Sequence, residues 1–435
     1  MQKPADGRKR VVIESVDPEI DAGRFAIKRI VGDTVVVEAD VFADGHDHVQ
    51  ARLLFRFRQI PSWTEASMQP LGNDRWRGEF PVARPGEYLY TVAGWIDHFD
   101  TWRSDLEKKI AAGQDIRIDL LNGARLIEQA AERSGRDDAD VLRRWEAQLR
   151  NAENLHAAQE AALNPELSAL MAQHLDPAME SRYDRELRVT VDREKARYSA
   201  WYEMFPRSAS AEPGKHGTFR DCEARLDYVE RLGFDVLYLP PIHPIGRSFR
   251  KGRNNHVAAT DGDVGSPWAI GAKEGGHTTI HPELGTMEDF RSLMRAAGKK
   301  GIELALDIAF QCAPDHPWVS EHPQWFKKRA DGTIQYAENP PKKYQDIYPL
   351  DFETSDWRAL WDGLRDVFLF WIEQGIRIFR VDNPHTKAFP FWEWVIAEIK
   401  RDYPDALFLS EAFTRPRVMQ RLAKVGFTQS YTYFT

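Results

Sequence analysis

The sequence predicts an incomplete (β/α)8 TIM barrel, with about six of its strands present, preceded by an N-terminal β-sandwich with a helical insertion. Strand patterns dominate the first hundred or so residues, and strand and helix patterns alternate from about residue 198. Within the alternating region, Asp382 and Glu411 each end a short apolar run. Barrels of this kind carry their catalytic groups at the carboxyl ends of the strands. The order of these patterns therefore predicts a supporting region followed by a catalytic one.

Composition limits the classes of partner. The chain has 435 residues, 42% of them hydrophobic, which is enough for several cores. Its net charge is −8, from 59 basic and 67 acidic residues, so it has no basic footprint for nucleic acid or an anionic membrane. Cys222 and Cys312 are its two cysteines, and we expect neither disulfides, nor a metal, nor a cofactor. Without a signal sequence or a membrane-length apolar run, the expected location is the cytoplasm.

The first region, residues 1–114, reads as short strands separated by turn signals such as Gly72-Asn73-Asp74. Their regular spacing is typical of an immunoglobulin-type sandwich. Strand character returns at residues 184–197, through Leu187–Val191, which we expect to rejoin the sandwich. The main predicted strands of the first region are Thr34–Val41, Leu53–Phe57 and Tyr88–Trp95.

Between these parts, residues 115–183 form the predicted helical insertion. Its composition shifts to Ala, Leu, Glu and Arg, and Leu142, Trp145 and Leu149 follow the spacing of an amphipathic helix. A protruding helical pair could form a dimer surface, and a monomeric decoration is the alternative interpretation.

The predicted barrel occupies residues 198–435. Helices are expected at Met287–Ala297 and Trp357–Glu373, and the long connection at about 313–350 is expected to be an inserted subdomain. Six strands cannot close an eight-stranded barrel, so we expect the chain to be a C-terminally truncated part of a longer protein. The predicted strands are Val236–Leu239, Thr278–His281, Ile302–Ile308, Ile376–Asp382, Ala406–Glu411 and Phe427–Phe434.

The strand that ends at Asp382 suggests a division of chemical roles. Alternating side chains place Arg380 and Asp382 on one face, where the guanidinium would keep the carboxylate ionised, as a nucleophile requires. A general acid needs a raised pKa instead, and Glu411 is the candidate. A structural Arg–Asp ion pair is the alternative for the first motif. Two carboxylates at consecutive strand ends favour the catalytic interpretation.

Three segments, taken in order, resemble the α-amylase superfamily. Asp307–Phe310 stands where that superfamily has its third-strand aspartate, Gly375–Asp382 is similar to the nucleophile motif, and Leu409–Ala412 is similar to the acid/base motif. Many members have a histidine shortly after the third-strand aspartate, whereas this chain has Cys312 there. That departure argues against an ordinary amylase.

Three further segments, Gln311–Trp318, Glu338–Tyr344 and Val381–Lys387, resemble the maltosyltransferases that use α-maltose 1-phosphate to extend α-1,4-glucan. The resemblance covers nearly the whole chain. It implies a retaining glycosyltransferase that moves maltosyl units to the non-reducing end of the glucan through a covalent glycosyl-enzyme. It also implies glycogen-like glucan synthesis in a bacterial cytoplasm, by a homodimer joined through the N-terminal modules.

The same resemblance implies roles for individual residues. Asp382 and Glu411 would be the catalytic pair, oriented by Arg380, and aromatic side chains such as Trp268, Trp318 and Tyr344 could stack on glucose rings. For the loop residues the alternative is a solvated surface loop, for His385 it is a structural histidine, and for each aromatic residue it is a position in the core. The substrate-binding residues that the resemblance implies are Lys251, Gln311 and Asn383 for the donor, Asn339, Lys342 and Tyr344 for the leaving phosphate, and His385 for a sugar hydroxyl.

The superfamily's third carboxylate, an aspartate after the seventh strand, has no counterpart in this sequence. Two other functions therefore stay open. The first is an α-glucan hydrolase of the same fold, and the second is a non-catalytic glucan-binding fragment.

Overall fold

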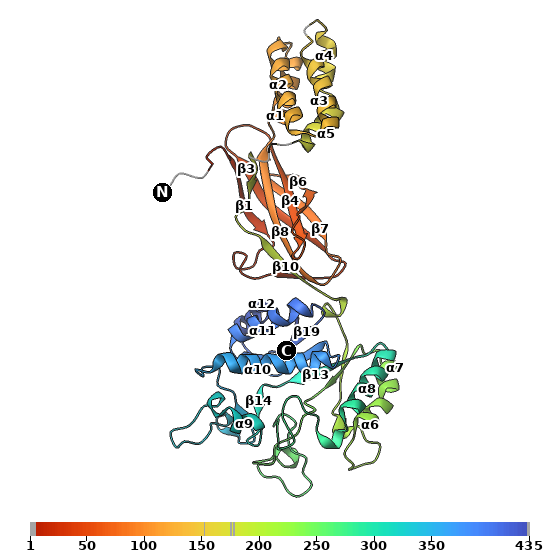
Figure 1. Ribbon diagram of the computed structural model, residues 1–435, viewed down its shortest axis with the longest axis vertical. Coiled ribbons are helices and arrows are strands. Elements are labelled where there is room, and N and C mark those ends of the chain that lie inside the picture. Colours follow the sequence, from red (N-terminus) through yellow and green to blue (C-terminus); the bar gives the residue numbers. More distant parts are fainter. Residues whose placement is uncertain (1–5, 152, 175, 177–178, 433–435) are drawn as a thin grey trace. The chain divides into compact units, whose positions relative to one another are not determined.

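The computed structural model describes residues 6–151, 153–174, 176 and 179–432 (Figure 1). The chain divides into two compact units, one of residues 1–83 and 87–191 and the other of residues 84–86 and 192–435. Each unit has its own hydrophobic core.

The first unit contains two antiparallel sheets, in the orders β1-β3-β7-β6 and β2-β10-β8-β4-β5, with β9 paired to β8. Alternation builds the core: along β3, Val35, Val37, Ala39 and Val41 are buried, and the residues between them are more exposed. β10 lies between β2 and β8, so the strand after the helices completes a sheet begun before them. The strands are β1 (Val11–Asp17), β2 (Ile27–Ile30), β3 (Thr34–Ala43), β4 (Val49–Phe57), β5 (Thr64–Ser67), β6 (Gln69–Gly72), β7 (Arg75–Pro81), β8 (Gly86–Ile96), β9 (Ser181–Arg182) and β10 (Leu187–Asp192).

Helices between β8 and β9 form a separate hydrophobic cluster within this unit. The first helix begins at His98, earlier than residue 115 where the composition changes, because Asp97 caps it by accepting from the backbone N–H of Asp100. Gly123 lets the Trp102 indole lie directly on the second helix. The helices are α1 (His98–Ala111), α2 (Arg117–Arg133), α3 (Arg136–Leu149), α4 (Leu155–Ala162) and α5 (Pro165–Gln173).

The second unit is built on one six-stranded sheet in the order β11-β12-β13-β18-β19-β20, with every neighbouring pair parallel. It is the incomplete barrel that the sequence predicts, and β11 and β20 are its edges. The strands are β11 (Trp201–Glu203), β12 (Val236–Leu239), β13 (Glu303–Ile308), β18 (Ile378–Val381), β19 (Leu407–Glu411) and β20 (Gln429–Tyr431).

Two of the predicted barrel strands need correction. Thr278–His281 forms turns instead of a strand, because Thr279 N donates back to Gly276 and Pro282 opens a short 3-10 helix. The first strand of the sheet is β11, which the sequence analysis missed. The predicted strand Phe427–Phe434 shortens to β20, and its last two residues lie outside the described residues.

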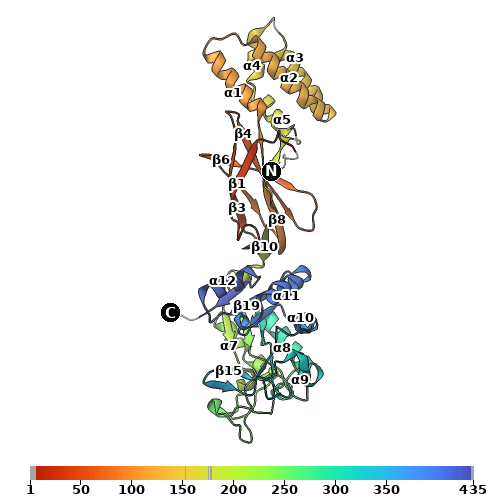
Figure 2. The ribbon, with the colours of Figure 1, turned by 90° about the vertical axis from the view of Figure 1, so that its left-hand side faces the viewer.

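Helices cover this sheet between its strands, as parallel pairing requires. α10 and α11, and likewise α11 and α12, contact each other and lie side by side in both views (Figures 1 and 2). α8 begins at a capping box formed by Thr286 and Asp289. The helices are α6 (Phe219–Ala224), α7 (Leu226–Arg231), α8 (Met287–Lys299), α9 (Pro317–Glu321), α10 (Trp357–Glu373), α11 (Phe389–Asp402) and α12 (Pro416–Lys424).

The long connection after β13 has a small framework of its own. β14 (Gln311–Cys312) pairs with β17 (Tyr348–Pro349) and closes the excursion, and β15 (Ala337–Asn339) pairs with β16 (Lys342–Tyr344) as a hairpin within it. Both ends of the excursion are therefore fixed close to the carboxyl end of β13.

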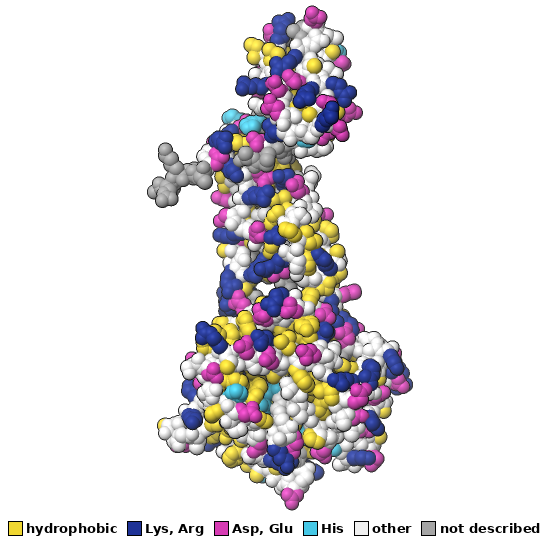
Figure 3. All heavy atoms as spheres, in the orientation of Figure 1, with side chains coloured by type: hydrophobic (Ala, Val, Ile, Leu, Met, Phe, Trp, Pro, Cys, Tyr) yellow, Lys and Arg dark blue, Asp and Glu magenta, His cyan; other side chains and the backbone are white. Residues whose placement is uncertain are grey.

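The surface mixes charges of both signs. Figure 3 shows Lys and Arg side chains interspersed with Asp and Glu on the visible face of each unit. Within the described residues, no helix has the length and apolarity needed to cross a bilayer.

Candidate active site

Strand pairing brings Asp307, Arg380 and Asp382 together at the carboxyl end of the sheet. Asp307 on β13 is in register with Arg380 on β18, and Asp382 N donates to Ile308 O at 2.9 Å. Arg380 Nη1 donates to Asp307 Oδ2 at 2.8 Å and to Asp382 Oδ1 at 3.0 Å. One guanidinium nitrogen therefore holds two carboxylates from neighbouring strands.

The other nitrogens of Arg380 face the next two strands. Nη2 lies 2.6 Å from Glu411 Oε1, and Nε donates to Tyr431 Oη at 2.9 Å. Glu411 on β19 and Tyr431 on β20 are themselves a register pair. Arg380 is thus a buried cation whose polar partners come from β13, β19, β20 and the residue that follows its own strand.

Asp307 is the most enclosed of the three carboxyls. Tyr238 Oη donates to its Oδ2 at 2.5 Å, Trp268 Nε1 approaches the same oxygen at 3.3 Å, and the side chain is fully buried. Burial raises the pKa of Asp307, and the Arg380 charge opposes that rise. All of these hydrogen bonds end on Oδ2, and Oδ1 is buried without a partner among the described residues. The enclosed side chain therefore lies behind Arg380 as a support.

Glu411 has the environment that a general acid needs. Burial raises its pKa, the neighbouring Asp382 charge raises it further, and Arg380 acts in the opposite direction. Asn383 N donates to Glu411 Oε2 at 3.1 Å, so both carboxyl oxygens have a fixed partner. At 12% and 9% exposure, the side chains of Glu411 and Asp382 stay reachable from solvent, whereas Asp307 does not.

The backbone after Asp382 turns sharply. Asn383 adopts a left-handed conformation with φ +42°, and its Nδ2 lies 3.5 Å from Asp382 Oδ2. Lys387 braces the turn, since its Nζ lies 3.4 Å from the carbonyl oxygens of both Asp382 and Asn383. His385 Nδ1 is buried and has no hydrogen-bond partner among the described residues.

The predicted donor-binding residues form two groups. Gln311 Nε2 donates to Trp268 O at 3.1 Å, which joins Gln311 to the aromatic residue beside Asp307. Lys251 is buried, and its Nζ reaches Lys343 O at 3.4 Å on the hairpin of β15 and β16.

That hairpin carries the residues predicted to bind phosphate. Asn339 and Lys342 are exposed and paired in register, and Tyr344 is half-buried. Among the described residues, no hydrogen bond joins Asn339, Lys342 or Tyr344 to Asp382 or Glu411.

Two family models match parts of the chain. A family described as "Alpha-1,4-glucan:maltose-1-phosphate maltosyltransferase, domain N/S" matches residues 9–193, and "Alpha amylase, catalytic domain" matches residues 203–363. A relative from Cereibacter sphaeroides, named alpha-1,4-glucan:maltose-1-phosphate maltosyltransferase, is 51% identical over 426 residues, which cover 98% of this chain and 71% of the relative. The chain belongs to this maltosyltransferase family.

Other relatives with the same printed name extend the match. The protein from Chlorobaculum tepidum is 56% identical across 100% of this chain and 65% of its own length, and that from Myxococcus xanthus is 54% identical across 98% and 65%. The chain thus spans about 65% of the length of these curated relatives. A solved α-amylase from Lactobacillus plantarum is 30% identical over 54% of this chain and 50% of that chain, with a TM-score of 0.43.

Sequence reasoning named part of the assembled site and missed part. It placed Asp382 and Glu411 beside Arg380, and in the structure both carboxylates lie within hydrogen-bonding distance of the Arg380 guanidinium. It gave no site role to Tyr431 or Lys387. Tyr431 gives a weak sequence signal because a single tyrosine is usually core, whereas Lys387, five residues after Asp382, could have been considered as a brace.

Trp318, predicted as a possible stacking surface for glucose, packs against other rings of the protein. Its ring stacks on His277 at a centroid distance of 5.1 Å and meets Trp325 edge-on at 5.3 Å. Trp318 therefore packs within the insertion.

Two groups of side chains in the described region have metal-like spacing. In the buried group of His277, Cys312 and His316, hydrogen bonds account for all four ring nitrogens. Trp318 N donates to His316 Nδ1 at 3.0 Å, His316 Nε2 bonds His277 Nδ1 at 3.1 Å, and His277 Nε2 donates to Ala309 O at 3.0 Å. This directed chain fixes both tautomers and gives the two histidines a structural role.

The second group consists of His216, His281 and Glu283 near the surface. His281 Nδ1 accepts from Glu283 N at 3.2 Å, which leaves the proton of the neutral ring on Nε2. His216 Nδ1 donates to Gly217 O at 2.8 Å. With His281 Nε2 protonated, this group is not arranged to hold a cation.

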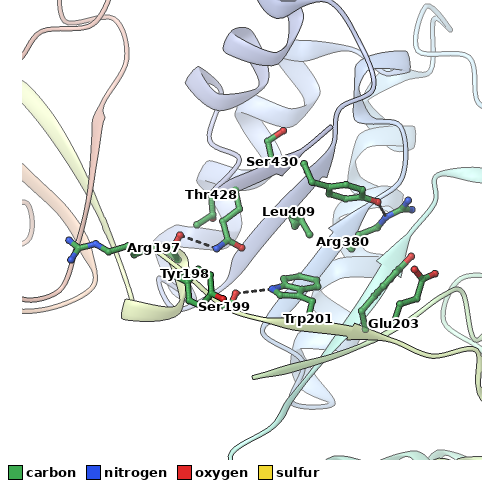
Figure 4. A pocket seen from close by; sticks show the side chains of 13 residues that line it. Arg197, Tyr198, Ser199, Trp201, Glu203, Arg380, Leu409, Thr428 and Ser430 are labelled. Carbon is green, nitrogen blue, oxygen red and sulfur yellow. Dashed lines mark hydrogen bonds between the residues drawn. The ribbon is translucent and has the colours of Figure 1, made fainter. Parts of the chain in front are cut away.

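A cavity of about 660 Å³ in the second unit lies between the edges of the sheet and not at the acid pair. Figure 4 shows the Trp201 ring of β11 next to Leu409, with Glu203 and Arg380 together on one side. Asp382 and Glu411 do not line it. The cavity therefore lies on the Tyr431 side of Arg380.

Proposed function

We propose that the protein containing this chain is a retaining glycosyltransferase that moves maltosyl units from α-maltose 1-phosphate to the non-reducing end of α-1,4-glucan. The observation that carries the proposal is the shared guanidinium: Arg380 contacts Asp382 at 3.0 Å and Glu411 at 2.6 Å. It fixes a nucleophile and an acid side by side, as a double displacement requires. Membership of the maltosyltransferase family supports the choice of donor and acceptor.

The first step breaks the bond between the anomeric carbon and the phosphate oxygen. Asp382 attacks that carbon, the phosphate leaves with the bonding electron pair, and Glu411 supplies a proton to the departing oxygen. The raised pKa of Glu411 favours the protonated form that this step requires. Arg380 holds the Asp382 carboxylate in position for that attack.

The second step reverses these roles. Glu411, now ionised, takes the proton from a hydroxyl at the non-reducing end of the glucan, and the freed oxygen attacks the anomeric carbon. The bond to Asp382 breaks, and the maltosyl unit is transferred with its α-configuration retained.

The leaving phosphate needs cations and hydrogen-bond donors. We assign these to the hairpin of β15 and β16, through Asn339, Lys342 and Tyr344, with Lys251 held against the same hairpin. Gln311 and Asn383 are assigned to the donor sugar and His385 to a sugar hydroxyl, which its unpartnered Nδ1 supports. A shift of the hairpin toward Asp382 on donor binding would complete the site.

We assign catalysis to residues 198–435, with the insertion at about 313–350, and support to residues 1–114 and 184–197. The helices of 115–183 would contribute to a homodimer formed through the N-terminal modules. The setting of the proposed reaction is glycogen-like glucan synthesis in the cytoplasm. Because the chain spans 65% of the Chlorobaculum tepidum relative, the whole protein is the right object for assays.

Phosphate release is the direct test. The full-length protein with α-maltose 1-phosphate should release phosphate when a glucan acceptor is added, and Asp382→Asn should abolish the release. A hydrolase of the same fold would instead produce reducing ends from starch without any phosphate donor. Glycogen binding without turnover, unchanged in Asp382→Ala, would indicate a non-catalytic glucan-binding protein.

A further inference from the structure

Phe249 combines two unfavourable features. Its backbone φ is +56°, and 57% of its side chain is exposed. The left-handed region is costly for a bulky residue because Cβ crowds the following carbonyl. The exposed ring also leaves apolar surface in water, and no aromatic or cation–π contact to it is formed among the described residues. Ring packing therefore does not explain the strained backbone.

Contacts on both sides of Phe249 fix this conformation. Ser248 N and Oγ donate to the Asp315 carboxylate at 2.8 and 2.6 Å. Arg250 Nε donates to Gly246 O at 2.8 Å, so its side chain folds back over the segment. Strained residues held in this way by their surroundings cluster at active sites and ligand clamps.

The loop that carries Phe249 extends from the surroundings of Asp307 to the hairpin of β15 and β16. At its start, Gly246 N donates to Ala269 O at 3.0 Å, next to Trp268, whose Nε1 approaches Asp307. Two residues after Phe249, Lys251 reaches the hairpin at Lys343 O. Phe249 therefore lies on a segment anchored to both parts of the candidate site.

We infer that Phe249 is a stacking platform for a glucose ring of the α-1,4-glucan acceptor. The glucan acceptor is uncharged, so the basic residues around Phe249 are better suited to the phosphate of the donor than to the acceptor. An exposed aromatic ring, in contrast, suits the apolar face of a sugar. The strained backbone then has a purpose, since it holds the ring out in solvent instead of letting it fold onto the core. The inference rests on the proposed maltosyl transfer to glucan.

The test compares three variants of the full-length protein. Phe249→Asn accepts the left-handed backbone and removes the ring, Phe249→Tyr keeps the ring, and Asn254→Gly changes a second left-handed residue of the same loop, with φ +52°. Maltoheptaose is the acceptor for kinetics. Glycogen-containing gels measure binding without turnover.

Phe249→Asn should raise the acceptor KM about tenfold and weaken glycogen retention, with the donor KM unchanged. It should also raise Tm slightly, because the strain is relieved. Phe249→Tyr and Asn254→Gly should keep the acceptor KM. A wild-type acceptor KM and wild-type glycogen retention in Phe249→Asn would overturn the inference, and so would an equal loss in Asn254→Gly.

Failure of the proposed function would look different. If the wild-type protein released no phosphate from α-maltose 1-phosphate with glucan, that function would be rejected. In that case, weaker glycogen retention by Phe249→Asn but not by the other two variants would still support the stacking role. Equal retention by Phe249→Asn and the wild-type protein would still overturn it.

Discussion

Glu411 Oε1 lies 2.6 Å from Arg380 Nη2, yet the pKa of Glu411 is raised. A cation at that distance favours the carboxylate, so burial and the neighbouring Asp382 charge outweigh it. The proposed reaction assigns different tasks to the two carboxyls that share this arginine. Arg380 sets the positions of both, and burial together with the Asp382 charge raises the pKa of Glu411.

In the proposed first step Glu411 acts as an acid, so activity with α-maltose 1-phosphate should fall as pH rises through the raised pKa of this residue. The basic limb of kcat/KM should therefore lie above the ordinary range for glutamate. With α-maltosyl fluoride, whose leaving group needs little proton assistance, Glu411→Gln should keep much of the first-step rate and lose that limb. A limb that persists in Glu411→Gln would assign it to another group.

Tyr431 should matter although it touches no predicted substrate position. Its Oη accepts from Arg380 Nε at 2.9 Å, and a hydrogen bond to a charged group is worth about 1.5–3 kcal/mol. Tyr431→Phe should lower kcat about ten- to hundredfold with little change in the donor KM, because Arg380 loses one of its tethers. Tyr228→Phe, at a tyrosine that is 47% exposed, is the matched control. Equal kcat values in both variants would remove Tyr431 from the positioning network.

The buried histidines predict a loss of stability in acid. Burial lowers the pKa of His243 to about 3, of His277 to about 4 and of His316 to about 2. Below the ordinary histidine pKa of 6.5, these residues bind protons in the unfolded chain but stay neutral in the folded protein. The free energy of unfolding should fall between about pH 6.5 and 4, by up to about 1.4 kcal/mol per pH unit for each histidine.

Urea unfolding of His277→Gln measures how much His277 contributes to the pH dependence of the free energy of unfolding. A glutamine can still donate to Ala309 O but does not titrate, so the variant should show a shallower dependence on pH. The exposed His98 supplies the control, His98→Gln, which should keep the wild-type slope. Parallel curves for the wild-type protein and His277→Gln would count against the histidine explanation.

Two helical glycines should respond oppositely to the same change. A Cβ at Gly123 would lie 2.0 Å from the Trp102 ring, whereas at Gly298 nothing lies within 4 Å. Gly123→Ala should destabilise the protein by about 1–3 kcal/mol through overpacking, and Gly298→Ala should stabilise it by up to about 1 kcal/mol. Thermal unfolding with both variants decides this. A gain in stability for Gly123→Ala would mean that the indole moves aside at little cost.

Local patterns were enough to predict much of the fold. The helical period of Trp357–Glu373 matched α10 to the residue, and the apolar runs before Asp382 and Glu411 marked β18 and β19. Thr278–His281 failed because a β-branched run between His277 and Pro282 looks like a strand, although turns and buried histidine contacts determine its path. β11 was missed because three residues are too few to show a period.

Non-local pairing explains what the sequence could not indicate about the site. Asp307 meets Arg380, and Glu411 meets Tyr431, only through strand register across residues far apart in the chain. Asp382 directly follows the strand that carries Arg380, so their contact followed from the alternation of side chains along one short segment. Lys251 and the hairpin at Lys343 are joined by loop packing, for which the sequence has no periodic signal.

Trapping the covalent intermediate tests the central claim most directly. Full-length Glu411→Gln, incubated with α-maltosyl fluoride and no glucan, should accumulate protein heavier by one maltosyl unit, and peptide mapping by mass spectrometry should place it on Asp382. The double variant Asp382→Asn/Glu411→Gln should gain no mass. A maltosyl unit found on any other residue would contradict the roles assigned to Asp382 and Glu411.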